Sequence, residues 1–171
     1  MGAEEGVLLA VFADIHANRQ AFSACLDYAR AHGAQRFVCL GDFVGYGADP
    51  EWTLETVMDL VNGGAVAVRG NHDNAVSSPS ETMNAEAQAA IEWTRGRLNA
   101  AQRRFLAELP MTLQEDDRLY VHSEASKIPR SGATCRARRM PRAASWPPKP
   151  TSPCAATSIS RHFIPCRRPR R

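Results

Sequence analysis

The residues best suited to chemistry in this sequence are Asp14 and His16, which follow an apolar run of strand length, Val7–Ala13. Side chains alternate along an extended backbone, so we expect the carboxylate and the imidazole to point the same way. Together these two ligand types suit a divalent transition metal better than calcium. The sequence therefore predicts part of a metal site where the first strand ends.

Three later strands are also predicted to end in polar clusters. The clusters are Asp42 after residues 36–40, Asn71, His72 and Asp73 after residues 65–68, and His122 after residues 119–121. In open α/β sheets, ligands bind outside the carboxyl ends of the strands. We therefore expect side chains that are far apart in the sequence to meet at one edge of a sheet.

Each cluster alone has a plainer explanation. Asp-x-His is more often a surface pair than a metal site, and Gly-Asp is usually a turn. Asn-His-Asp after a glycine is usually a loop or a helix cap, and an isolated His122 is more often a hydrogen-bonded histidine than a ligand. Four clusters in an order that one sheet can gather favour a single site.

The segments between these clusters predict an α/β fold. Strands and helices alternate over the first 68 residues, which indicates right-handed βαβ units. The predicted helices are residues 18–32, capped by Asn18 and ended by Gly33, then 51–61, 84–98 and 100–109, the last stopped by Pro110. Residues 74–80 are predicted to be a loop, and residues 111–114 and 118–122 a hairpin around Glu115-Asp116-Asp117.

The combined pattern resembles the calcineurin-like metallophosphoesterase superfamily, in its bacterial phosphodiesterase and protein phosphatase-like branch. The matching motifs are Asp14-Ile15-His16, Gly41-Asp42-Phe43-Val44-Gly45-Tyr46-Gly47, Gly70-Asn71-His72-Asp73 and Val121-His122. They lie in order within residues 7–124. The resemblance implies a four-layer α/β/β/α sandwich, incomplete at its C-terminal end, with a dinuclear metal site.

The resemblance also implies which residues bind the two divalent metals, which would be Mn, Fe, Zn, Ni or Mg ions. Asp14 and His16 would bind the first metal, and Asp42 would bridge both. Asn71 and His122 would bind the second metal. Two ions about 3.5–4 Å apart can clamp the attacking and leaving oxygens of a phosphate ester.

Four further residues are candidates for catalysis or substrate binding. The resemblance implies that His72 is not a ligand but acts on the leaving group as an acid or stabilises the phosphate charge, with Asp73 as a possible orienting partner. Arg69 can reach a substrate phosphate, and a solvated strand-end arginine is an equal alternative. Tyr46 can stack on a substrate, but we favour loop packing for it.

The composition divides the chain into a domain at 1–124 and a basic Pro/Arg-rich tail at 125–171. The tail has no Asp or Glu, but holds Lys127, Lys149, ten arginines and eight of the 11 prolines. The first 124 residues carry a formal net charge of −9. The tail is expected to be disordered. The abrupt loss of acidic residues and of apolar periodicity at this boundary favours a frameshifted gene over a genuine basic tail.

One element of the superfamily pattern is missing from the sequence. A Gly-His-x-His element would complete both metal sites, and His162 has neither a glycine nor a second histidine beside it. Translating the other two reading frames beyond codon 127 tests the frameshift hypothesis, because one of them should encode this element. Without it, we expect hydrolysis by this 171-residue form to be reduced or absent.

The leading functional hypothesis is a cytoplasmic enzyme that hydrolyses phosphate mono- or diesters with the help of metal ions. Its substrate would be a phosphorylated small molecule, a nucleotide or a phosphoprotein. We expect no membrane partner, since no run approaches about 18–20 apolar residues. The alternative is a non-catalytic binder of nucleic acid or acidic partners through the tail, which would lose salt-dependent RNA binding on deletion of residues 125–171. A third hypothesis, a metal-free scaffold, is decided by metal analysis.

Overall fold

The structure is a computed structural model that describes residues 7–78 and 83–123. The predicted tail, its boundary with the first domain and His162 lie outside these residues. The structure therefore describes most of the predicted domain at residues 1–124.

A three-stranded parallel sheet forms the centre of the fold. Its strands are β1 (Leu9–Phe12), β2 (Arg36–Cys39) and β3 (Val66–Ala67), in the order β1-β2-β3. Helix α1 (Arg19–Ala31) connects β1 to β2, and α2 (Pro50–Asn62) connects β2 to β3. The predicted alternation of strands and helices is confirmed. Parallel pairing leaves the carboxyl ends of all three strands at one edge.

Local sequence explains where α1 begins and ends. The side chain of Asn18 accepts a hydrogen bond from the backbone N–H of Ala21 at 3.0 Å, which confirms the predicted cap. Phe22 and Leu26, one turn apart, are buried against the sheet. The helix ends before Gly33, whose φ of +78° reverses the chain direction at little cost for a residue without Cβ.

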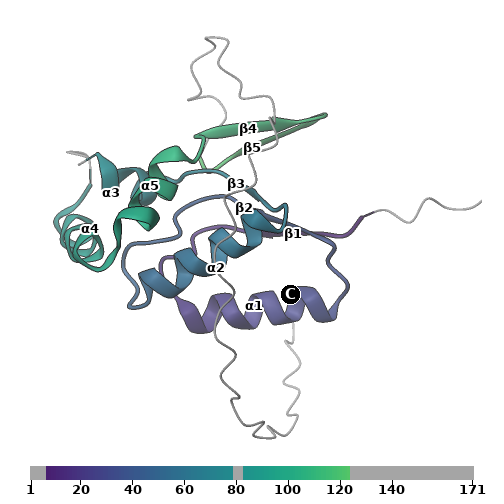
Figure 1. Cartoon of the computed structure of the whole chain (residues 1–171), viewed down its shortest axis with the longest axis horizontal. Coiled ribbons are helices and arrows are strands. Elements are labelled where there is room, and N and C mark those ends of the chain that lie inside the picture. The colour runs from purple at the N-terminus through teal and green to yellow at the C-terminus, as the bar shows by residue number, and fades with distance from the viewer. Residues whose placement is uncertain (1–6, 79–82, 124–171) are drawn as a thin grey trace, which may run out of the picture.

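The two faces of the sheet bury different clusters. Cys39 and Ala67 face the cluster that α1 and α2 cover, whereas their strand neighbours Val38 and Val66 face the opposite side. On that opposite side lies a hairpin of β4 (Thr112–Glu115) and β5 (Arg118–Val121), which contributes Leu113 and Tyr120. Figure 1 shows α1 and α2 on one side of the sheet and the hairpin on the other.

An ion pair fixes the hairpin at the start of β2. The guanidinium of Arg36 donates to both carboxylate oxygens of Glu115 at 2.8 Å. This hairpin was predicted from sequence, but Glu115, which was expected in the turn, is the last residue of β4 and pairs with Arg118. Among the described residues the layers are therefore helix, sheet and second sheet, three of the four layers of the predicted α/β/β/α sandwich.

Three more helices lie at the end of the sheet. They are α3 (Asn71–Ser77), α4 (Ala85–Arg97) and α5 (Ala100–Glu108). Helix α3 corrects one prediction, because part of the predicted loop at residues 74–80 is helical. Its burial explains the error: Ala75 and Val76 pack into the core, so tertiary contacts stabilise a short helix whose sequence is rich in polar residues.

The fold class predicted from sequence, mixed α/β, is confirmed by these elements. Among the described residues, no helix combines the length and apolar character needed to cross a bilayer.

Candidate metal centre

The predicted site residues gather around the carboxylate of Asp42. Its Oδ2 lies 3.2 Å from Nε2 of His122 and 3.9 Å from Nε2 of His16. The same nitrogen of His16 lies 4.0 Å from Oδ1 of Asp14. Asp42 is buried, whereas 64% of the Asp14 side chain is exposed. The ends of β1, β2 and β5 thus contribute to one cluster, as the sequence predicted.

The first, second and third loops of this cluster are the segments that follow β1, β2 and β3. Backbone hydrogen bonds hold the first and second loops together. The N–H groups of Asp14, His16 and Ala17 donate to the carbonyls of Gly41, Asp42 and Phe43, at 3.2, 2.8 and 2.7 Å respectively. These bonds extend the contact between β1 and β2 beyond the strands. The first and second predicted motifs are therefore fixed to each other by main chain rather than by side chains alone.

The backbone at the cluster departs from the extended conformation assumed in the sequence analysis. Asp14, His16, Ala17, Asp42 and Tyr46 all have left-handed φ values, between 48° and 61°. The argument that Asp14 and His16 converge through strand alternation is therefore wrong, because both lie beyond β1 in a strained turn. Non-glycine residues with positive φ are uncommon, and such strain concentrates at functional sites.

Two glycines allow the second and third loops to approach each other. A Cβ at Gly70 would overlap the backbone N and Oδ1 of Asp42, and a Cβ at Gly41 would overlap the backbone N of Gly70. Gly41 also has a φ of +93°. This close approach lets the backbone N–H of His72 donate to Oδ1 of Asp42 at 2.9 Å. Sequence reasoning treated these glycines only as motif members.

Two histidines are oriented by backbone carbonyls that the sequence analysis did not identify. Nδ1 of His122 lies 2.7 Å from the carbonyl oxygen of Leu40, and Nδ1 of His16 lies 3.3 Å from that of Val44. A carbonyl can only accept, so these bonds require the proton on Nδ1. Each Nε2 then faces Asp42. This arrangement is the usual outer support of metal-binding histidines.

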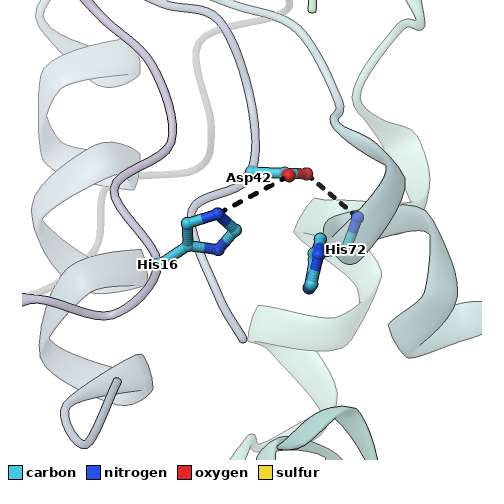
Figure 2. Close-up of side chains that lie close together, drawn as sticks. All are labelled: His16, Asp42 and His72. Atoms are coloured by element: carbon cyan, nitrogen blue, oxygen red, sulfur yellow. Dashed lines mark hydrogen bonds and ion pairs between the residues drawn. The ribbon is translucent and has the colours of Figure 1, made fainter. Parts of the chain in front are cut away.

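The donor atoms form two groups that share Asp42. One group is Asp14, Asp42 and His122, and the other is His16, Asp42 and His72, with the ligand atoms of each group within 4.8 Å of one another. Figure 2 shows His16 and His72 approaching the carboxylate of Asp42 from opposite sides. Carboxylate with imidazole is a donor set for a divalent transition metal. The residues present therefore fit such an ion.

Electrostatics within the cluster favour charge on Asp42. Burial opposes its ionisation, but the hydrogen bonds from the His122 ring and the His72 backbone outweigh burial and hold the pKa of that carboxyl below its usual value. The hydrogen bond between the His122 ring and the Asp42 carboxylate also raises the pKa of His122 to about 9. Burial lowers the pKa of His72. Binding of a metal to Nε2 of His122 requires that nitrogen to lose its proton.

Asp73 fixes the backbone of the second and third loops. The residue is fully buried, and its Oδ1 accepts from the N–H groups of Phe43 and Val44 at 2.9 and 3.3 Å. Its Oδ2 accepts from the N–H of Gly70 at 3.0 Å. Burial raises the pKa of Asp73 to about 7, against the opposing effect of these three donors. Both carboxylate oxygens thus contact backbone amides, which favours a positioning role.

The two remaining predicted site residues, Arg69 and Asn71, flank Gly70 in the sequence. Asn71 is the first residue of α3 and is exposed, and its place in the ligand set stays a prediction. Arg69 donates from Nη1 to the carbonyl of Ala107 at 3.1 Å, in the last turn of α5. A cation near a helix C-terminus is favourable. The role of Arg69 at a substrate phosphate also stays a prediction.

Comparison with known proteins agrees with the fold. The sequence profile of the calcineurin-like phosphoesterase family matches residues 7–128. The chain belongs to this family. Members of the calcineurin-like phosphoesterase family use divalent metal ions, and the two donor groups at Asp42 are candidates for binding them here. The resemblance noted from the four motifs is confirmed.

Three known proteins are similar to this chain over part of their length. An uncharacterised protein of Methanocaldococcus jannaschii, MJ0912, is 35% identical over 111 residues, which are 64% of this chain and 44% of that protein. The metallophosphoesterase of Sphaerobacter thermophilus is 31% identical with a TM-score of 0.55, over 67% of this chain and 46% of that one. The protein PH1004 of Pyrococcus horikoshii, at 22% identity and a TM-score of 0.58, covers 64% and 50% and shows the fold alone.

The chain thus spans about half the length of the calcineurin-like phosphoesterases it matches. The matched part includes every predicted site residue from Asp14 to His122.

Proposed function

We propose that this chain carries out metal-dependent hydrolysis of phosphate mono- or diesters at the cluster around Asp42. The observation that carries the proposal is that two groups of possible metal ligands share the carboxylate of Asp42. One group adds Asp14 and His122, and the other adds His16 and His72. A shared carboxylate holds two cations together against their mutual repulsion. The membership of a phosphoesterase family supports the same chemistry.

The proposed metal ligands are those expected from sequence. They pair Asp14 with His16 and leave out His72, whereas the two donor groups of the structure pair Asp14 with His122 and His16 with His72. Asp14 and His16 would hold one divalent ion, Asn71 and His122 the other, and Asp42 both. When bound, divalent ions supply Lewis acidity, which polarises a phosphoryl oxygen and lowers the pKa of a bound water. We propose manganese for the assays below, because carboxylates such as those of Asp14 and Asp42 are suitable ligands for Mn²⁺.

The protein's own groups would then position the ester and move a proton. His72 lies beside Asp42 and is buried, and its backbone N–H donates to the Asp42 carboxylate. We propose that it contacts the leaving oxygen, either as an acid or as a hydrogen-bond donor to the phosphate. Asp73 would act indirectly. Its hydrogen bonds to the backbone of both loops would keep Asp42 and His72 in fixed positions relative to each other.

The rate proposed for this 171-residue form is low. The four motifs within residues 7–123 supply no Gly-His-x-His element, and losing a ligand from each metal weakens binding. The substrate is proposed to be a phosphorylated small molecule, a nucleotide or a phosphoprotein.

Hydrolysis of p-nitrophenyl phosphate and its bis-ester with Mn²⁺ tests the proposal. We expect slow release of nitrophenol that chelation abolishes and that Asp42→Asn lowers to background. Asp27→Asn, an exposed acid on α1, is the matched control and should retain the rate of the unaltered chain. Release that is absent, or that survives Asp42→Asn, would contradict the proposal.

A further inference from the structure

Tyr46 is an exposed aromatic residue at the edge of the metal cluster. It is 55% exposed, although the preceding residues Phe43 and Val44 are completely buried. Its ring centroid lies 5.0 Å from that of His16 and 4.8 Å from that of His72. The ring therefore contacts two of the histidines at the site and still has surface open to solvent.

The loop holds this ring in place at a conformational cost. Tyr46 has a φ of 61°, which is unfavourable for a bulky residue. On one side, a Cβ at Gly45 would overlap the ring of His72; on the other, a Cβ at Gly47 would overlap the backbone of His16 and Ala17. Gly47 also donates its N–H to the carbonyl of His16 at 3.0 Å. Close contacts thus fix the loop on both sides of Tyr46.

These observations weigh against the sequence expectation that Tyr46 packs within its loop, because its ring contacts His16 and His72 and stays largely exposed. A ring that served packing would be buried like Phe43, and the loop would gain nothing from strain that keeps the ring exposed. An aromatic face beside a phosphate site has a specific use, because planar rings stack on it.

We propose that Tyr46 is a binding subsite for a planar aromatic group, so that the site selects phosphate esters carrying a nucleobase or an aryl ring. The inference rests on the proposed function, since the metal cluster would hold the phosphate. Tyr46 does not react with the ester. It increases the affinity for one class of ester and leaves the phosphate contacts unchanged.

Equilibrium binding to the full chain with Mn²⁺ tests the subsite without requiring turnover. One arm compares AMP with ribose 5-phosphate, which has the same phosphate and sugar but no base. The second arm compares phenyl phosphate with ethyl phosphate. Calorimetry gives the affinities, and saturation-transfer NMR on the ring protons reports contact with the aromatic group.

Two variants separate stacking from backbone effects. Tyr46→Ala keeps a Cβ at the same positive φ, so its backbone strain matches that of the unaltered chain, while Tyr46→Phe keeps the ring. We expect Tyr46→Ala to weaken AMP or phenyl phosphate by about 5- to 100-fold, with ribose 5-phosphate and ethyl phosphate changed less than about 2-fold. Tyr46→Phe should bind as the unaltered chain does.

The arm with the larger effect identifies the group. An effect on AMP alone assigns a nucleobase, and an effect on phenyl phosphate alone assigns an aryl ester. Equal affinity for esters with and without a ring, equal loss for both in Tyr46→Ala, or no binding of any ester would overturn the inference. Ring-selective binding without hydrolysis would contradict the proposed function but leave the subsite standing.

Discussion

Nε2 of His122 lies 3.2 Å from Oδ2 of Asp42, although the two residues come from different sheets. Asp42 follows β2 of the parallel sheet, and His122 follows β5 of the hairpin. The Arg36–Glu115 ion pair and the cluster around Tyr120 hold the hairpin against the sheet. The metal cluster therefore depends on packing between layers as well as on the edge of one sheet.

Removing the imidazole of His122 should weaken metal binding. We expect His122→Gln to lower Mn²⁺ affinity by about 10-fold or more, since even outer-shell changes cost about 10- to 100-fold. Calorimetric titration with Mn²⁺ measures the affinity. The control is His32→Gln, an exposed histidine that stacks on Tyr28 at the end of α1. If both variants bind as the unaltered chain does, His122 is not a ligand.

A methyl group at Gly70 should destabilise the fold, whereas one at Gly96 should not. Gly70→Ala would force a Cβ against Asp42, and overpacking of this kind costs about 1–3 kcal/mol in free energy of unfolding. Gly96 lies within α4 with nothing near its Cβ position, so Gly96→Ala should stabilise by about 0.5–1 kcal/mol. Urea unfolding followed by circular dichroism measures both. A neutral Gly70→Ala would show that the loops can separate.

Asp73→Asn should destabilise the chain even without metal. An amide offers one acceptor oxygen where the carboxylate offers two, so at least one buried backbone N–H loses its partner. The expected loss is about 1–3 kcal/mol in free energy of unfolding. Thermal unfolding in the presence of a chelator measures it. Asp59→Asn on the exposed face of α2 should be neutral, and an equally neutral Asp73→Asn would remove Asp73 from its positioning role.

The two cysteines of the described residues should differ in reactivity. Cys25 is exposed on α1, whereas Cys39 is buried in β2, where burial raises the pKa of its thiol to about 12. Thiolate is the reactive form, so we expect iodoacetamide to modify Cys39 at least about 100-fold more slowly than Cys25 in the folded chain. Peptide mass spectrometry measures both rates. In urea the two rates should converge; similar rates without urea would contradict the burial of β2.

The sequence predicted the elements of this fold better than the geometry of the site. Polar caps and apolar periodicity gave α1 and the hairpin, because local sequence determines where such elements begin and end. The short helix α3 was missed because its stability comes from burial of Ala75 and Val76, which local sequence does not reveal.

At the site, the residue types were predictable and their conformations were not. Asp14 and His16 lie near each other, but through left-handed turns and bonds to the next loop rather than through strand alternation. The carbonyls of Leu40 and Val44 that orient the histidines belong to apolar residues, so no sequence pattern marks them. The exposure of Tyr46 depends on the packing of the glycines beside it, which only a three-dimensional arrangement reveals.

The contact between Gly41 and Gly70 limits how this protein can change by mutation. The loop after β2 and the loop after β3 meet without space for a methyl group on either side. Exchanging one loop for that of a relative with a different backbone path would therefore disrupt the other, and the two loops should be transferred as a pair in chimeric proteins. Tyr46 is exposed and its side chain is not enclosed, so libraries aimed at new substrates can vary that position first.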